Sequence, residues 1–179
     1  MTSLHRFWAA LGPKRHAYAA GGLFFLGVLL RALLLNATTS DTQQFVLPWF
    51  DRLARAGYAA LGQALPNKVG TDANYTPPYY YLLYLASLLD GAAPRLWLIK
   101  FVSIAFDALA AAFAYRAVRL NFSHTRALYA SAALFAAPTV ILNGAWWGQC
   151  DIIWVSLILG SFSFAMARRP LWAVILFGV

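Results

Sequence analysis

Residues 96–118 read LWLIKFVSIAFDALAAAFAYRAV. At a helical rise of about 1.5 Å per residue, a stretch of this length crosses a hydrocarbon layer of about 30 Å. Two ionisable side chains, Lys100 and Asp107, lie well inside it, where charge is costly and is usually paired or functional. They share a helix face but are separated by roughly 10 Å along the axis. We therefore predict a membrane-spanning helix whose charges join a network with another helix, in preference to a proton relay.

The composition of the whole chain is that of a membrane protein. Hydrophobic residues make up 61% of the 179 residues, charged residues 11%, and the mean hydropathy is +0.61. Soluble domains are roughly 45–50% apolar and about 25% charged. The formal net charge of +8 does not indicate a nucleic-acid partner, because the basic residues lie at the ends of apolar runs and form no single patch. Cys150 is the only cysteine, which excludes an intramolecular disulfide.

Further apolar stretches extend this interpretation to an all-α, polytopic transmembrane helical bundle. Besides 96–118, we predict spans at about 18–35, 127–142 and 152–167, and the start of another at 171–179. Because natural chains rarely stop inside a span, residues 1–179 are expected to be the N-terminal part of a longer, single transmembrane domain. No small-residue cleavage site follows the first apolar run, so it is not expected to be a removable signal.

The segment 77–89 decides the topology. It is short for a span and rich in tyrosine, which favours the membrane–water boundary. If it does not cross, and the N-terminus is cytoplasmic, eight Lys and Arg residues lie inside and five outside; if it crosses, the numbers reverse. The positive-inside bias favours the first arrangement. Residues 37–95 then form one long outside loop with interfacial helices, and residues 143–151 lie on the same outer face. The membrane is expected to be a bacterial inner or cell membrane.

Two polar clusters are expected on that outer face. Asp41 follows the first span, and Trp146, Trp147, Gln149 and Asp151 precede the fourth. Carboxylates beside aromatic rings are typical of sugar sites, where a carboxylate acts as general base or holds a metal ion. The alternative is structural: Asp41 caps a helix that begins near residue 42, and Asp151 caps the fourth span. The residues alone leave both interpretations open.

The order of these motifs resembles the membrane glycosyltransferases of the GT-C superfamily, in particular the PIG-V-like mannosyltransferases. The resemblance covers about residues 15–165 and rests on these segments: Asp41, FVLPW at 45–49, NYTPPYYY at 74–81, Lys100 with Asp107, and WGQCD at 147–151. It implies transfer of a hexose such as mannose from a polyprenyl-phosphate donor to a lipid or glycan acceptor at the outer face. It also implies that the reaction inverts the anomeric carbon and that Asp41 is the essential carboxylate, acting as general base.

The resemblance further assigns roles to other residues. Asp151 and Gln149 correspond to a second polar cluster, and we add Trp146, Trp147, Asn74 and Tyr75 as expected substrate contacts. Arg95 and Arg31 are candidates for the leaving phosphate, although snorkelling of both side chains to the membrane surface is an equal alternative. No cofactor is certain and metal dependence stays open, because Asp41 and Asp151 permit a divalent cation.

Two remaining expectations concern the long loop and the competing functions. We predict a helix over 42–62 whose residues Phe45, Trp49, Leu53 and Ala56 dip into the membrane interface. A transporter or channel subunit is the alternative function, because intramembrane charges also mark ion paths. A membrane assembly protein without activity is a further alternative.

Overall fold

A computed structural model describes residues 15–73 and 75–178 of the chain. Regular structure in this part is helical, and its β-structure is limited to two isolated bridges, Pro66 with Asp72 and Asp90 with Ala93. The expected all-α class is therefore confirmed for the described residues. The α-helices are α2 (Arg15–Leu34), α3 (Leu47–Ala56), α4 (Pro77–Ser87), α5 (Arg95–Arg119), α6 (His124–Phe135), α7 (Pro138–Ile141), α8 (Asp151–Met166) and α9 (Pro170–Phe177). The basic tail at 1–14, Asn74 and Val179 lie outside the described residues.

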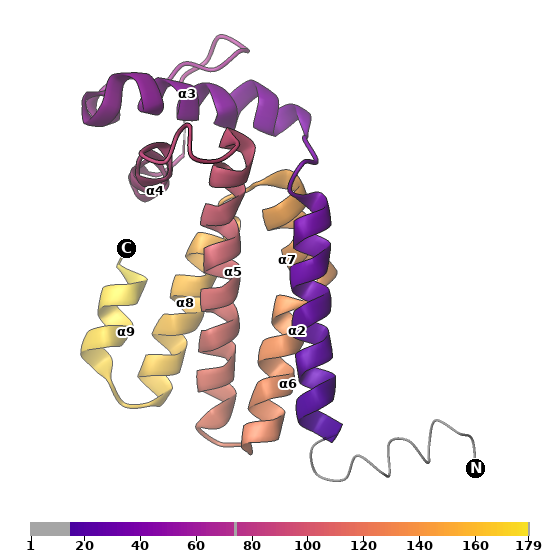
Figure 1. Ribbon diagram of the computed structural model, residues 1–179. Helices are drawn as coiled ribbons and strands as arrows, with labels where there is room; N and C mark the ends of the chain where they lie inside the picture. Colours follow the sequence, from indigo (N-terminus) through magenta and orange to yellow (C-terminus); the bar gives the residue numbers. More distant parts are fainter. Residues whose placement is uncertain (1–14, 74, 179) are drawn as a thin grey trace.

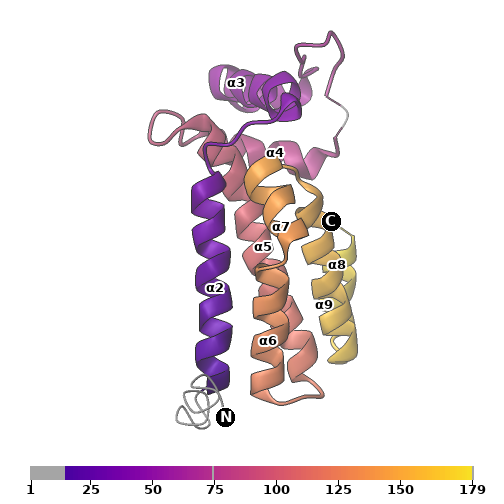
Figure 2. The ribbon, with the colours of Figure 1, turned by 90° about the vertical axis from the view of Figure 1, so that its right-hand side faces the viewer.

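Two of the described helices, α2 and α5, are long and apolar enough to cross a membrane. They correspond to the predicted spans 18–35 and 96–118. Helix α6 packs between them, α8 packs on the other side of α5, and α9 packs on α8. Figures 1 and 2 show these helices side by side, with α3 and α4 lying across one end of the group.

The third predicted span, 127–142, corresponds to a bent pair of helical segments. Helix α6 begins earlier, at His124, and ends at Phe135. A second helical segment, Pro138–Trp147, follows at an angle of 45°, so that three candidate spans exist if this bent pair counts as one. Proline lacks the amide hydrogen that would continue the helix and disfavours helical geometry in the residue before it. Ala137 is accordingly extended, with φ −61° and ψ 128°.

The last two predicted spans correspond to shorter helices. Helix α8 covers Asp151–Met166 and is apolar, but its 16 residues reach only about 24 Å as a straight helix. Helix α9 has eight residues, Pro170–Phe177. The start of a further helix at 171–179 is thus placed correctly to within one residue.

The loop 37–95 contains helices, as expected, and residues 42–62 are helical throughout, but they do not form a single α-helix. A π-helical turn at Thr42–Val46 leads into α3, and a 3₁₀ segment follows at Gly57–Gly62. Gly57 ends α3 with φ +60°, a conformation that side-chain-bearing residues rarely adopt. Trp49 and Leu53 are 1% and 0% exposed. They pack with Tyr79 and Leu83 of α4 in the protein core, so they do not dip into the membrane interface.

A buried polar face on α5 connects the helices. The Arg31 guanidinium of α2 donates to Asp107 Oδ2 from both Nε (2.9 Å) and Nη2 (2.8 Å). Arg31 also donates to the carbonyl of Phe135 at 2.8 Å and lies 4.0 Å from the centre of the Phe135 ring. Both charged residues are at most 3% exposed. The predicted network between Asp107 and another helix is confirmed, and Arg31 is its partner.

This ion pair gives a prediction about stability. Asp107→Leu leaves the Arg31 guanidinium buried without its carboxylate, and we expect the free energy of unfolding in detergent to fall by roughly 3 to 5 kcal/mol. The matched double variant, Arg31→Met with Asp107→Leu, removes both charges and should recover most of that loss. Unfolding in mixed micelles, followed by circular dichroism, measures both. Equal stability of Asp107→Leu and the wild type, or a double variant no better than the single one, would contradict this account.

Candidate functional site

The chain around Asp41 is held in place by α5. Helix α2 ends at Leu34 and leaves carbonyl groups without helical partners. The buried ammonium group of Lys100 donates to two carbonyls there, Leu34 O at 2.7 Å and Ala37 O at 2.6 Å. A cation at this position also complements the negative end of the helix dipole. Lys100 therefore fixes the point from which the segment carrying Asp41 leaves α2.

The second predicted cluster is anchored to the same helix. A π-helical turn, Leu142–Trp147, ends at Gly148, whose φ of +75° reverses the chain direction. Ser103 of α5 donates to the Gln149 carbonyl at 2.6 Å. Thr42 donates to the Trp147 carbonyl at 2.7 Å and so joins the two clusters directly.

Asp41 lies at the centre of the site. Its Oδ2 accepts a hydrogen bond from Gln149 Nε2 at 2.6 Å and another from the Trp147 indole at 3.2 Å. Gln149 Oε1 in turn accepts from the Tyr75 hydroxyl at 2.9 Å. The Asp41 side chain makes no capping bond to the helix that follows, so the capping interpretation is wrong for this residue. Four residues named from the sequence thus meet in one chain of hydrogen bonds.

The protonated Tyr75 hydroxyl fixes the direction of the hydrogen bonds that lead to Asp41. Burial raises the pKa of the Tyr75 hydroxyl to about 12, and repulsion from Cys150, Asp41 and Asp151 acts in the same direction. A phenol that keeps its proton donates to the Gln149 carbonyl oxygen. The amide nitrogen of Gln149 is then the end that faces Asp41, and it can only donate.

A hollow of about 260 Å³ opens beside Asp41. Its lining consists of Thr39, Ser40, Asp41, Trp146 and Trp147. The Trp146 and Trp147 side chains are 47% and 48% exposed, so their rings are accessible from this hollow. The volume is just below the range of about 300–1,000 Å³ that is typical of small-molecule sites, so a single sugar ring is a suitable occupant. The indole faces offer the apolar surface on which such a ring stacks.

Asp41 and Asp151, which were expected to act in one site, line separate hollows in the structure. Asp151 accepts from Asn143 Nδ2 at 2.9 Å and lines a separate hollow of about 220 Å³ with Thr139 and Val140. It stands in the first turn of α8, where a carboxylate favours the positive end of the helix dipole. The two acids lie on the same end of the molecule, since both act on the Tyr75 hydroxyl, but they line different hollows.

Two further candidates for the site, Arg31 and Arg95, have other partners in the structure. Arg31 is engaged by Asp107 inside the helix group, which accounts for it better than either phosphate contact or snorkelling. Arg95 is bonded to Asp90 and Asp51, each at 2.8 Å, on the exposed surface. Neither guanidinium contacts Asp41 among the described residues. Asn74, the remaining candidate, lies outside them.

Sequence reasoning missed the residues that position the site. Ser103 is a neutral hydroxyl residue in an apolar stretch, and Thr42 is one of several polar residues in a row, so neither gives a signal by itself. The available signal was the spacing of Lys100, Ser103 and Asp107, three polar residues on one face of an apolar helix. In residues 15–73 and 75–178, no group of three or more His, Cys, Asp or Glu side chains is arranged to hold a metal ion.

Comparison with known proteins adds no assignment. The chain matches no protein-family model, no curated protein and no solved structure.

The raised pKa of Tyr75 gives a spectroscopic prediction. The difference in phenolate absorbance between the wild type and Tyr75→Phe should titrate with a midpoint near pH 12. Because the folded pKa exceeds the ordinary value of 10.0, the contribution of this group to stability is complete below pH 10 and is lost as the pH rises towards 12. Circular dichroism in parallel identifies the range in which the protein stays folded. A midpoint near pH 10 in the folded protein would contradict the buried, hydrogen-bonded hydroxyl.

Proposed function

We propose that the chain is part of a polytopic membrane glycosyltransferase that resembles the GT-C superfamily. It would transfer a hexose, such as mannose, from a polyprenyl-phosphate donor to a lipid or glycan acceptor at the outer face of the membrane. The observation that carries the proposal is Asp41, a carboxylate oriented by Gln149 and Trp147 beside two exposed indoles. A carboxylate and stacking surfaces at the end of an apolar helix group suit a lipid-linked sugar.

The charge distribution supports a multi-pass arrangement with this end outside. Arg119 and Arg126 flank the turn from α5 to α6, and Arg168 and Arg169 form the turn from α8 to α9. Figure 1 shows both turns at the end of the helix group opposite to α3 and α4. With these turns in the cytoplasm, the arrangement obeys the positive-inside bias, and the Asp41 hollow faces outward.

The proposed reaction is an inverting displacement. The acceptor hydroxyl oxygen forms a bond to the anomeric carbon while the bond from that carbon to the phosphate oxygen breaks, and its electron pair leaves with the phosphate. The hydroxyl proton passes to the carboxylate of Asp41. Asp41 Oδ1 has no hydrogen-bond partner among the described residues and is available for this step, whereas Oδ2 is held by Gln149 and Trp147.

The intramembrane charges favour this proposal over a transporter or channel subunit. Arg31 and Asp107 are bonded to each other, and Lys100 is bonded to two backbone carbonyls. Charges that are bonded in this way join helices to one another, although Asp107 Oδ1 is buried without a hydrogen-bond partner. A transport path would instead need polar groups that line a water-filled cavity.

Replacing Asp41 tests the enzymatic role. Asp41→Asn keeps the shape of the side chain and removes the base, so we expect the rate of sugar transfer to fall by about 10²- to 10⁴-fold with unchanged membrane insertion. Transfer of labelled hexose from polyprenyl-phosphate donors is measured in membranes of cells that make the protein. The matched control is Asp90→Asn, an exposed acid of the same loop, which should retain activity. Full activity of Asp41→Asn would exclude Asp41 as the general base.

Cysteine labelling tests the topology. In a Cys150→Ala background, Leu85→Cys on α4 and Phe122→Cys in the α5–α6 turn introduce single thiols at side chains that are 57% and 50% exposed. A membrane-impermeant maleimide added to intact cells should label position 85, and should label position 122 only after permeabilisation. The reverse result would show that the proposed orientation is wrong.

A further inference from the structure

A second, larger hollow lies on the far side of α3. It has a volume of about 690 Å³ and is lined by Pro48, Asp51, Arg52, Arg55, Ala64, Pro66, Asn67, Lys68 and Asp72. Its α3 residues stand on the helix face opposite to the buried Trp49, Phe50 and Leu53. Figure 1 shows the loop that forms the other wall above α3, away from the bundle. This hollow therefore faces away from the helix group and is distinct from the one beside Asp41.

Backbone hydrogen bonds hold the two walls of the hollow together. The loop closes on itself through Asn67 N to Thr71 O at 3.1 Å and Ala73 N to Leu65 O at 2.9 Å. The amide of Lys68 donates to the carbonyl of Gln44 at 2.9 Å, which attaches the loop to the helical turn preceding α3. Lys68 is thus fixed opposite α3 by its own backbone.

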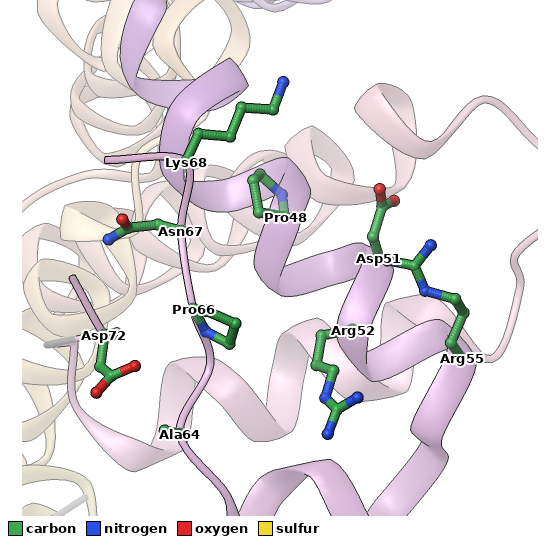
Figure 3. Close-up of a pocket in the computed structure, with 9 residues that line it drawn as sticks. All are labelled: Pro48, Asp51, Arg52, Arg55, Ala64, Pro66, Asn67, Lys68 and Asp72. Carbon is green, nitrogen blue, oxygen red and sulfur yellow. The ribbon is translucent and has the colours of Figure 1, made fainter. Parts of the chain in front are cut away.

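Positive charge in the hollow exceeds the negative charge available to neutralise it. Figure 3 shows Arg52 and Arg55 on α3 and Lys68 on the facing loop. Two carboxylates face these three cations: Asp51, which is paired at 2.8 Å with an Arg95 that is also bonded to Asp90, and Asp72, which has no ion-pair partner in the described residues. Arg52 donates to the amide oxygen of Gln63 at 2.7 Å, which holds its guanidinium in place without neutralising it. The side chains of Arg55 and Lys68 have no hydrogen-bond or ion-pair partner within 15–73 and 75–178.

We propose that this hollow binds a phosphate group of an anionic ligand through Arg52, Arg55 and Lys68. Cations that two separate elements bring to one hollow repel each other unless an anion lies between them. Guanidinium groups present a fork of donors that matches a phosphate, and lysine adds a compact charge. The ligand is either a soluble phosphoester or the headgroup of a membrane lipid. This inference does not depend on the proposed sugar transfer, and its test measures binding alone.

The test uses the purified protein in phosphatidylcholine nanodiscs, which leave both faces open to solvent. Sodium pyrophosphate is titrated in a calorimeter at low ionic strength. We expect saturable binding of one pyrophosphate per chain, and a dissociation constant at least about ten-fold weaker in the variant Arg55→Gln with Lys68→Gln. Because neither side chain has a partner in the described structure, circular dichroism should show the variant as folded as the wild type.

A matched control separates a site from general attraction. Arg168→Gln with Arg169→Gln removes the same charge at the opposite end of the molecule, and should leave the dissociation constant within about two-fold of the wild-type value. Absence of saturable binding, or equal weakening in both double variants, would overturn the proposal. Repeating the titration with phosphatidylglycerol in the nanodiscs identifies the source of the phosphate. If phosphatidylglycerol weakens pyrophosphate binding to the wild type but not to the Arg55→Gln, Lys68→Gln variant, the natural ligand is a lipid headgroup. If phosphatidylglycerol leaves pyrophosphate binding unchanged, the ligand is a soluble phosphoester.

Discussion

The buried polar face of α5 is the constraint on which the rest of the structure depends. Lys100, Ser103 and Asp107 occupy successive positions on one side of an apolar helix, and each bonds to a different segment: the end of α2, the carbonyl of Gln149, and Arg31. In an apolar environment an unsatisfied polar group costs several kcal/mol, so these contacts leave few alternative packings. The same helix therefore fixes the two segments that carry Asp41 and Trp147.

Much of this arrangement could be read from the sequence, because it depends on length, hydropathy and short motifs. The apolar helix at 96–118 and the placing of Asp41 with Gln149 and Trp147 on one face were predicted in this way, whereas Tyr75 was expected only as a substrate contact. The burial of Trp49 and Leu53 was not, since an apolar helix face fits a membrane interface and a protein core equally well. The partner of Arg31 was also missed, because periodicity within one helix contains no information about which neighbour faces it. Pro138 was visible in the sequence, but the predicted span 127–142 ran through it and did not include a bend.

The hollow beside Asp41 and the hollow beyond α3 are distinct chemical environments at the same end of the helix group. Beside Asp41, exposed indoles and one oriented carboxylate suit the apolar faces and hydroxyl groups of a sugar. Beyond α3, basic side chains on a loop and a helix suit phosphate. Arg31 is buried in its ion pair with Asp107, and Arg95 is bonded to Asp51 and Asp90, so neither contacts Asp41 in the described structure. Within the proposed enzyme, Asp41 and the indoles thus serve the acceptor hydroxyl and the sugar ring, while stabilisation of the leaving group falls to other residues.

The most direct measurement is photo-crosslinking of a polyprenyl-phosphate hexose that carries a diazirine on the sugar. In membranes that contain the protein, our account predicts that the label attaches to the peptides bearing Asp41 or Trp146 and Trp147, and that excess unmodified donor abolishes it. Trp146→Ala with Trp147→Ala should lose the label, because the surface on which the ring stacks is removed. A label that resists competition, or one that attaches only to other segments, would contradict a sugar site beside Asp41.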